Sequence, residues 1–104
     1  MLFRSVQVVL AQPENQPHRA DISKMIVHRS ARKQGIAAAL MAAAEAHALL
    51  EGKTVLVLDT ASDDAERVYR KLGWQECGVI PDYALLPDGA LCATTYFYKR
   101  LTSV

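Results

Sequence analysis

The sequence predicts an α/β fold: a mixed sheet with a central parallel βαβ unit and elements in the order β-β-α-β-α-β-β. One observation is the alanine-rich segment from Gly35 to Glu51, whose apolar positions recur at helical spacing and which ends before Gly52, a typical helix terminator. These positions are Ile36, Leu40, Ala43, Ala44 and His47. The other is Thr54 to Leu58, an apolar run without alternation, as in a strand covered on both faces. With a strand before the helix, these elements form a right-handed unit.

Two strands are expected ahead of the helix. Phe3 to Ala11 is rich in valine and ends in the polar segment Gln12 to Pro17, whose prolines predict a turn. The second strand is Asp21 to Val27. Because the connection is too short for a crossover helix, we expect the two strands to be antiparallel.

A short helix and two more strands are expected after the apolar run. Asp63 and Glu66 have the spacing of a capping box, with Asp in place of Ser or Thr, and a helical pattern of apolar residues continues until Gly73. The remaining elements are strands at Trp74 to Ile80 and Thr94 to Leu101, with a long loop between them at Pro81 to Ala93.

Composition limits the class of protein. A chain of 104 residues, 51% hydrophobic and 22% charged, fits one globular domain over residues 1–104. The net charge of +1 argues against a dedicated nucleic-acid binder. Cys77 and Cys92 lack the spacing of a zinc site or of a disulfide framework, so we expect reduced thiols and no metal. No run is long enough to span a membrane and no signal-peptide pattern is present, so a cytoplasmic protein is expected.

The junction between the second strand and the long helix favours an anion site. A helix beginning near Lys33 leaves its first backbone N–H groups without a cap, because no Ser, Thr, Asp or Asn lies between positions 31 and 37. An anion would satisfy these groups, and Gly35 would let it approach the backbone. Arg29, Arg32 and Lys33 add positive charge nearby. The alternative is that Ser30 caps an earlier helix start and Gly35 is merely tolerated in the first turn.

Two motifs in this order of elements carry a family resemblance. Arg32-x-x-Gly35-x-Ala37 opens the long helix, and Tyr69-Arg70-Lys71-Leu72-Gly73-Trp74 ends the short one. Together they resemble the GNAT family of N-acetyltransferases, whose acetyl-CoA motif is R/Q-x-x-G-x-G/A and whose later motif is Tyr-x-x-x-Gly-aromatic. The resemblance covers residues 3 to 101 and implies a truncated GNAT fold.

The resemblance implies acetyl-CoA as a co-substrate. The end of the second strand would present backbone groups to the pantetheine arm and the acetyl carbonyl, and amides of the helix start would surround the pyrophosphate. Ser62 falls where many members carry an Asn that contacts the cofactor. The cofactor-binding residues implied are Ile26, Val27, Arg32, Lys33, Gln34, Gly35, Ile36, Ala37, Ala38 and Ser62. Asp21 to Val27 and Thr54 to Asp59 would separate to admit the pantetheine.

Acetyl transfer to an amine needs an acid and a base. Tyr69 is the candidate acid, because a phenol with a pKa near 10 is protonated at neutral pH and can stabilise the departing thiolate. The alternative is that Tyr69 only packs at the helix end. Asp21 is the candidate base, since it lies where some histone-type relatives carry a catalytic Glu. His18 and His28 are rivals by pKa, and many members use other residues or only water.

Relatives also carry further elements ahead of the segment that matches Phe3 to Ala11. This strand would then be a bare sheet edge, so we expect a homodimer in which a second copy covers it, by strand pairing or by exchange of the C-terminal strand. The expected acceptor is a small-molecule amine, near the Pro81 to Ala93 loop. Two alternatives stay open: a CoA-binding remnant or partner-dependent subunit without its own catalysis, and a module that binds nucleic acid or protein.

Overall fold

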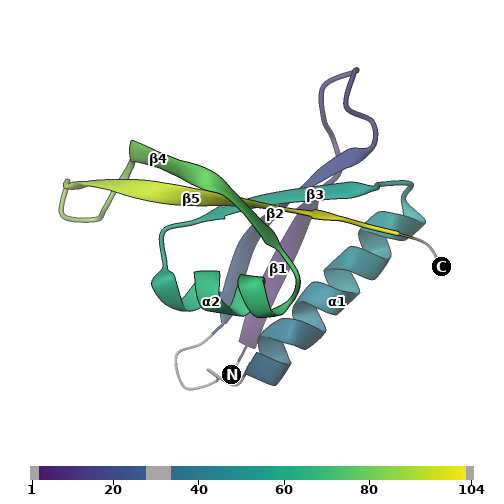
Figure 1. The fold of residues 1–104 in the computed structure, drawn as a ribbon, viewed down its shortest axis with the longest axis horizontal. Helices are drawn as coiled ribbons and strands as arrows, with labels where there is room; N and C mark the ends of the chain where they lie inside the picture. Colours follow the sequence, from purple (N-terminus) through teal and green to yellow (C-terminus); the bar gives the residue numbers. More distant parts are fainter. Residues whose placement is uncertain (1–2, 28–33, 103–104) are drawn as a thin grey trace. The chain divides into compact units, whose positions relative to one another are not determined.

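The computed structural model describes residues 3–27 and 34–102 and has the predicted order of elements (Figure 1). The elements are β1 (Phe3–Val9), β2 (Arg19–Val27), α1 (Gln34–Leu50), β3 (Val55–Thr60), α2 (Asp63–Lys71), β4 (Gln75–Leu85) and β5 (Leu91–Arg100). The five strands form a mixed sheet in the order β1-β2-β3-β5-β4, which confirms the α/β class. The described chain divides into two compact units. The first contains the residues up to 57 and those from 100 onward, and the second contains residues 58–99. No helix in the described ranges is both long and apolar enough to cross a membrane.

In the first unit, β1 and β2 are antiparallel and β2 and β3 are parallel, as predicted. Val8 lies opposite Ile22 in the first pair, and Ala20 opposite Leu56 in the second. Helix α1 lies against β1 and β2 (Figure 1). The core contains Ala20, Ile22, Met41, Ala44, Ala48 and Leu56.

The buried stripe of α1 differs from the prediction by about one residue. Met41, Ala44 and Ala48 are buried, whereas Ala43 and His47, which were expected on the core side, are exposed. The reason is that α1 is apolar almost all round, so the sequence has few polar residues to mark the solvent side. The small side chains on the buried stripe allow the helix backbone to come close to the sheet.

Helix α1 ends in a Schellman motif, followed by a buried lysine. Gly52 has a φ of +82°, its N–H donates to the Leu49 carbonyl, and the Lys53 N–H donates to the Ala48 carbonyl. The Lys53 side chain is buried, and its Nζ donates to the carbonyl oxygens of Leu10 (3.0 Å) and Pro17 (2.8 Å). The lysine therefore fastens both ends of the β1–β2 connection to the end of α1.

Replacing this lysine by methionine is expected to destabilise the protein by about 2 kcal/mol, since two hydrogen bonds from a charged donor are lost. Lys53→Met keeps the length of the side chain and leaves the Leu10 and Pro17 carbonyls without the ammonium group. Urea unfolding measures the effect. Thr54→Ala, at the exposed neighbouring position, is the control and should change stability by less than about 0.5 kcal/mol.

In the second unit, α2 begins one residue earlier than the capping-box prediction implies. The N-cap is Ser62, whose Oγ accepts from the Ala65 N–H at 3.2 Å, so Asp63 is the first helical residue. Both oxygens of Glu66 serve other residues, with Oε1 accepting from Arg70 and Oε2 from Thr95. The capping-box assignment to Asp63 and Glu66 was therefore wrong, because a hydroxyl one residue upstream is the better-placed acceptor.

The predicted loop from Pro81 to Ala93 is mostly strand. β4 continues to Leu85 and β5 starts at Leu91, so the connection is a short turn in which Asp88 Oδ1 accepts from the Ala90 N–H at 2.9 Å. Pro81 led to the wrong prediction, since proline is rare inside strands. Here the register shifts between Ile80 and Ala84 and Asp82 has a φ of +53°, so a bulge accommodates the proline.

Candidate functional site

The start of α1 has the features of an anion-binding end. The helix begins at Gln34, close to the predicted position, and its first turn has no acidic residue. This turn is formed by Gln34, Gly35, Ile36 and Ala37. The next residue, Ala38, is half-buried. Arg32 and Lys33, two of the predicted phosphate ligands, and the alternative cap Ser30 lie outside the described residues. The described helix start thus has N–H groups at its end and no carboxylate that would repel an anion.

The end of β2, where Ile26 and Val27 were predicted to contact the cofactor, lies beyond the described β2–β3 ladder. Parallel pairing joins Arg19–Asp21 to Val55–Val57, and β2 itself continues to Val27. The predicted separation of Asp21 to Val27 from Thr54 to Asp59 was therefore wrong at Asp21 and at Val55 to Val57, because these residues take part in the parallel ladder.

Asp21, the predicted base, lies next to a cation. It stands between Ala20 and Ile22, which are buried, so strand alternation turns its side chain to the opposite face. Its Oδ1 is 3.3 Å from Arg19 Nε, and the two side chains are 39% and 30% exposed. Arg19 also donates through Nη2 to Gln12 Oε1. The Asp21 carboxylate is thus held by the Arg19 guanidinium, which is in turn held by Gln12 in the β1–β2 connection.

The second motif has a structural explanation. Gly73 has a φ of +92°, the Gly73 N–H donates to the Arg70 carbonyl (3.2 Å), and the Trp74 N–H donates to the Tyr69 carbonyl (3.0 Å). These are the two bonds of a Schellman motif. The motif also brings together the side chains of the two residues joined by its longer-range bond, here Tyr69 and Trp74. Here the rings of Tyr69 and Trp74 have centroids 6.1 Å apart. The spacing Tyr-x-x-x-Gly-Trp therefore fixes Tyr69 at the helix end with Trp74 against it.

Tyr69 is held in an apolar and acidic setting. Only 6% of the residue is exposed, and its ring also meets Phe97 edge-on at 5.9 Å. Burial raises the pKa of the Tyr69 phenol above its ordinary value of 10.0, and the negative charge of Asp59 raises it further. Thr94 Oγ1 donates to Asp59 Oδ2 at 2.7 Å and so holds that carboxylate in place. The phenol therefore keeps its proton at neutral pH, as a proton donor must.

The raised pKa predicts a loss of stability in alkali. Above about pH 10 the unfolded chain releases the Tyr69 proton first, so the free energy of unfolding falls as the pH rises through the higher pKa of the folded state. Below pH 10 this contribution is unchanged. Tyr69→Phe removes it, so urea unfolding from pH 8 to 11 should give a shallower decline for the variant. Equal slopes for the two proteins would contradict the shifted pKa.

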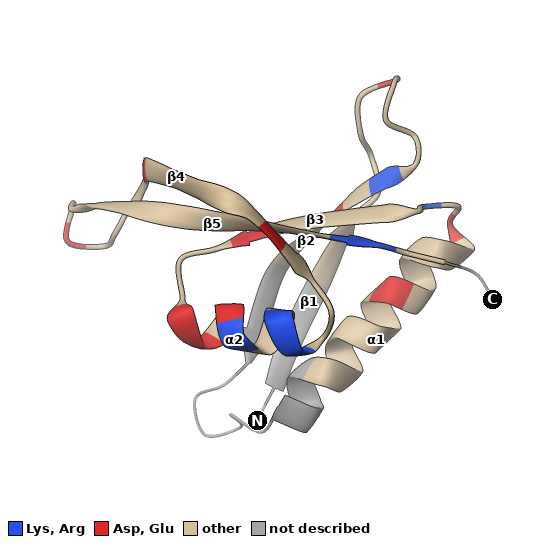
Figure 2. Cartoon of the chain, viewed as in Figure 1, with Lys and Arg blue, Asp and Glu red and all other residues tan. Residues whose placement is uncertain are grey.

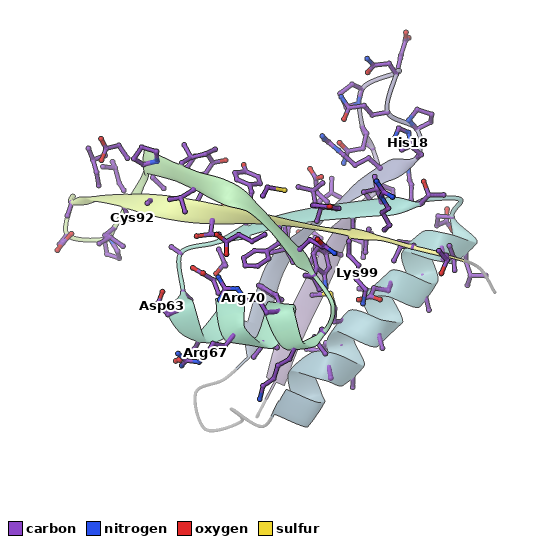
Figure 3. All side chains as sticks on the ribbon, in the orientation of Figure 1. His18, Asp63, Arg67, Arg70, Cys92 and Lys99 are labelled. Atoms are coloured by element: carbon purple, nitrogen blue, oxygen red, sulfur yellow. The ribbon has the colours of Figure 1, made fainter. Side chains whose placement is uncertain are left out.

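A charged network joins α2 to β4 and β5. Arg70 Nη2 donates to Glu76 Oε1 (2.5 Å) and to Glu66 Oε1 (3.0 Å), and its guanidinium carbon lies 5.6 Å from the centroid of the Phe97 ring. The hydrogen bond to Glu76 raises the pKa of Arg70 above its ordinary value, and Glu66 adds to this. Figure 2 shows the acidic first turn and basic last turn of α2, which suit the helix dipole. The side chain of Arg70 is labelled in Figure 3.

Three residues around Tyr69 were missed by sequence reasoning: Asp59, Thr94 and Phe97. A signal for Asp59 existed, because a carboxylate directly after an apolar parallel strand lies at the strand end where α/β folds place ligands. Thr94 and Phe97 are far from Asp59 in the sequence and had no such signal.

The remaining candidates lie as follows. Ser62, predicted to contact the cofactor, is exposed at the start of α2, where its oxygen already accepts from Ala65. Its hydroxyl hydrogen is a further donor, so the cofactor role stays a prediction. His18 (labelled in Figure 3) is exposed in the turn before β2, and its carbonyl accepts from the Thr54 N–H at 2.8 Å. His28 lies outside the described residues.

Known proteins match both the sequence and the fold. Residues 7–74 of the 104 match the model of the Acetyltransferase (GNAT) family. A GNAT-family acetyltransferase from Streptococcus pneumoniae has a TM-score of 0.81 at 19% identity, covering 92% of this chain and 58% of that one. The protein yncA from Salmonella typhimurium, solved with its cofactor acetyl-CoA, has a TM-score of 0.79 at 19% identity, covering 95% and 58%.

A ribosomal-protein-alanine N-acetyltransferase from Brucella melitensis has a TM-score of 0.78 at 23% identity, covering 92% of this chain and 60% of that one. The chain thus spans less than two thirds of the length of each of these structures. At these identities the structures establish the shared fold, and the family model covers well over half of the sequence. This chain belongs to the GNAT family of acetyltransferases.

Proposed function

We propose that this protein transfers the acetyl group of acetyl-CoA to the primary amine of a small molecule. The observation that carries the proposal is the start of α1, which has no acidic residue in its first turn and coincides with Arg32-x-x-Gly35-x-Ala37. A diphosphate suits free N–H groups and a helix dipole. Family membership and the yncA structure with acetyl-CoA support this choice of co-substrate.

In the proposed reaction the amine nitrogen attacks the thioester carbonyl carbon, a C–N bond forms and the C–S bond breaks. The Tyr69 phenol donates a hydrogen bond to the departing thiolate and stabilises it, which suits a group that burial keeps protonated at neutral pH. The amine loses a proton to a base as it attacks. Backbone groups at the end of β2, Ile26 and Val27, bind the pantetheine arm, and Ser62 donates a hydrogen bond to it.

Asp21 is the proposed base, and Arg19 holds its carboxylate. A pH–rate profile of kcat/KM tests this role. Asp21→Asn is expected to lower kcat/KM about 10- to 100-fold and to change the acidic limb of the profile. An unchanged acidic limb in Asp21→Asn would assign the base to another group or to water.

The whole proposal is tested in two steps with the purified chain. Calorimetric titration with acetyl-CoA should give saturable binding, and no binding at millimolar concentration would refute it. Release of free thiol is then measured with a panel of amines, comprising small amines, amino acids and a peptide with an N-terminal alanine. Turnover with small amines supports the proposal. Binding without turnover on any amine would favour a CoA-binding remnant or partner-dependent subunit.

A further inference from the structure

In the second unit, the sheet face opposite α2 carries a carboxylate that β5 holds in position. Asp59 stands near the end of β3 and is exposed, and its Oδ2 accepts from Thr94 Oγ1 at 2.7 Å. The neighbouring Thr95 donates to Glu66 of α2, so strand alternation places Thr94, and with it the Asp59 carboxylate, on the other face. Thr94 is buried, and its hydroxyl therefore orients the carboxylate from a fixed position.

Two phenols continue this face beyond the carboxylate. Tyr96 lies on the same side of β5 as Thr94, about 7 Å further along the strand. The Tyr96 hydroxyl is 2.7 Å from that of Tyr83, and the two rings meet edge-on with centroids 5.9 Å apart. Every residue from Val79 to Leu91 is exposed, so the phenol pair is accessible. We call Asp59, Tyr83 and Tyr96 the tyrosine–aspartate site.

The bulge in β4 explains why Tyr83 lies on this face. Ala84 is paired with Cys92, which is on the Tyr96 side of β5, so regular alternation would turn Tyr83 away from Tyr96. The register shift before Ala84 and the positive φ of Asp82 (+53°) break this alternation. Bulges of this kind redirect a side chain. The bulge therefore directs Tyr83 onto Tyr96.

The surface between the carboxylate and the phenols is apolar and open. Ile80 is paired with Thr94 and therefore lies on the same face, 43% exposed. Gly78 is paired with Tyr96, and a Cβ added at Gly78 would meet no atom within 4 Å outside its chain neighbours. Space beside the Tyr96 ring is thus available to a ligand, and a chain of methylene groups would bury apolar area there.

The strands that form this site bring only negative charge. Between Glu76 and Lys99 the only charged residues are Asp82 and Asp88, and β3 contributes Asp59 (Figure 2). A surface without Lys or Arg does not favour a carboxylate or phosphate on its ligand. A carboxylate beside the faces of two phenol rings favours an ammonium group, through ion pairing and cation–π interactions.

The same carboxylate is a neighbour of Tyr69, since its charge raises the pKa of that phenol. A ligand of the tyrosine–aspartate site therefore lies beside the group that would stabilise the thiolate. The nitrogen that attacks a thioester must be neutral, so it is not the cation that the carboxylate holds. We infer that Asp59, Tyr83 and Tyr96 bind a second ammonium group of the acceptor, and that the acceptor class is a small diamine. This inference rests on the proposed function and names its substrate class.

Selectivity between matched acceptors tests the inference. Cadaverine and hexylamine have the same length, and the far end is an ammonium group in one and a methyl group in the other; δ-aminovalerate ends in a carboxylate. With acetyl-CoA and the full chain, kcat/KM should be at least about tenfold higher for cadaverine than for hexylamine, and lowest for δ-aminovalerate. Equal values for cadaverine and hexylamine would overturn the diamine class and leave acetyl transfer standing.

Asp59→Asn separates recognition of the second ammonium from other roles. Asn keeps an acceptor oxygen for Thr94 Oγ1 and loses the charge. The ratio of kcat/KM for cadaverine to that for hexylamine should fall about fivefold, because any effect through Tyr69 acts on both amines alike. An equal loss with both amines would reject the second-ammonium role. Asp88→Asn is the matched control, since it removes a charge from the hairpin turn and keeps an oxygen for the Ala90 N–H; the ratio should stay within about twofold.

Calorimetric titration of cadaverine into the purified chain measures the site without turnover. Saturable binding is expected, weakened about fivefold by Asp59→Asn and about threefold by Tyr83→Leu, which keeps an apolar side chain and removes the ring. Tyr83→Phe keeps the ring and should bind more tightly than Tyr83→Leu. No binding of cadaverine by the wild type would refute the site. Binding without acetylation of any amine would instead support the ammonium site and refute the proposed function.

Discussion

Tyr69→Phe is expected to lower kcat about 10- to 1,000-fold while the dissociation constant for acetyl-CoA stays within about twofold. The substitution removes only the hydroxyl and keeps the ring between Trp74 and Phe97. Because the phenol is protonated at neutral pH, its loss removes the proposed hydrogen-bond donor to the thiolate without removing a contact to the nucleotide. Steady-state kinetics with the best amine of the panel and calorimetric titration of acetyl-CoA measure the two effects separately.

Tyr98→Phe is the matched control for this experiment. It removes a phenol from β5 and is expected to leave kcat within about twofold. A purely packing role for Tyr69 predicts that Tyr69→Phe keeps the wild-type kcat, because the packed ring is retained. Turnover of Tyr69→Phe equal to that of the wild type would therefore reject Tyr69 as the acid.

Gly35→Glu is expected to weaken binding of acetyl-CoA by at least about 100-fold, since it places a carboxylate beside the proposed diphosphate site. The same change should not lower the melting temperature. Glutamate has a higher helix propensity than glycine, and a negative charge in the first turn of a helix interacts favourably with its dipole. Calorimetric titration and thermal unfolding of one preparation measure both effects, so a loss of binding is distinguished from a loss of folding.

Ala42→Glu provides the control in the same helix. Ala42 is exposed, two turns further along α1, so the variant carries the same added charge at a distance from the helix start. Its dissociation constant is expected to stay within about threefold of the wild type. Equal weakening by both variants would mean that net charge alone governs binding, and unchanged binding by Gly35→Glu would reject the start of α1 as the diphosphate site.

Local chemistry made much of this protein predictable. The Gly52 and Gly73 helix ends and the antiparallel β1–β2 pair depend on residues close together in the chain, and each was confirmed. The parallel β2–β3 pair was also confirmed, and the apolar run without alternation at Thr54 to Leu58 had indicated it. The errors arose where two local solutions compete. Ser62 and Asp63 are both good N-caps, and the proline at position 81 could end a strand or enter a bulge.

By itself the sequence determined the Gly52 end of α1 and the Tyr-x-x-x-Gly-Trp end of α2, because backbone hydrogen bonds within a few residues specify them. Tertiary structure alone decided which stripe of α1 is buried, which charges reach Tyr69, and that the β4–β5 hairpin remains uncovered. The physical reason is sequence separation. Asp59, Thr94 and Phe97 act on Tyr69 only because strands distant in the chain are brought together by the fold, and no local pattern records that contact.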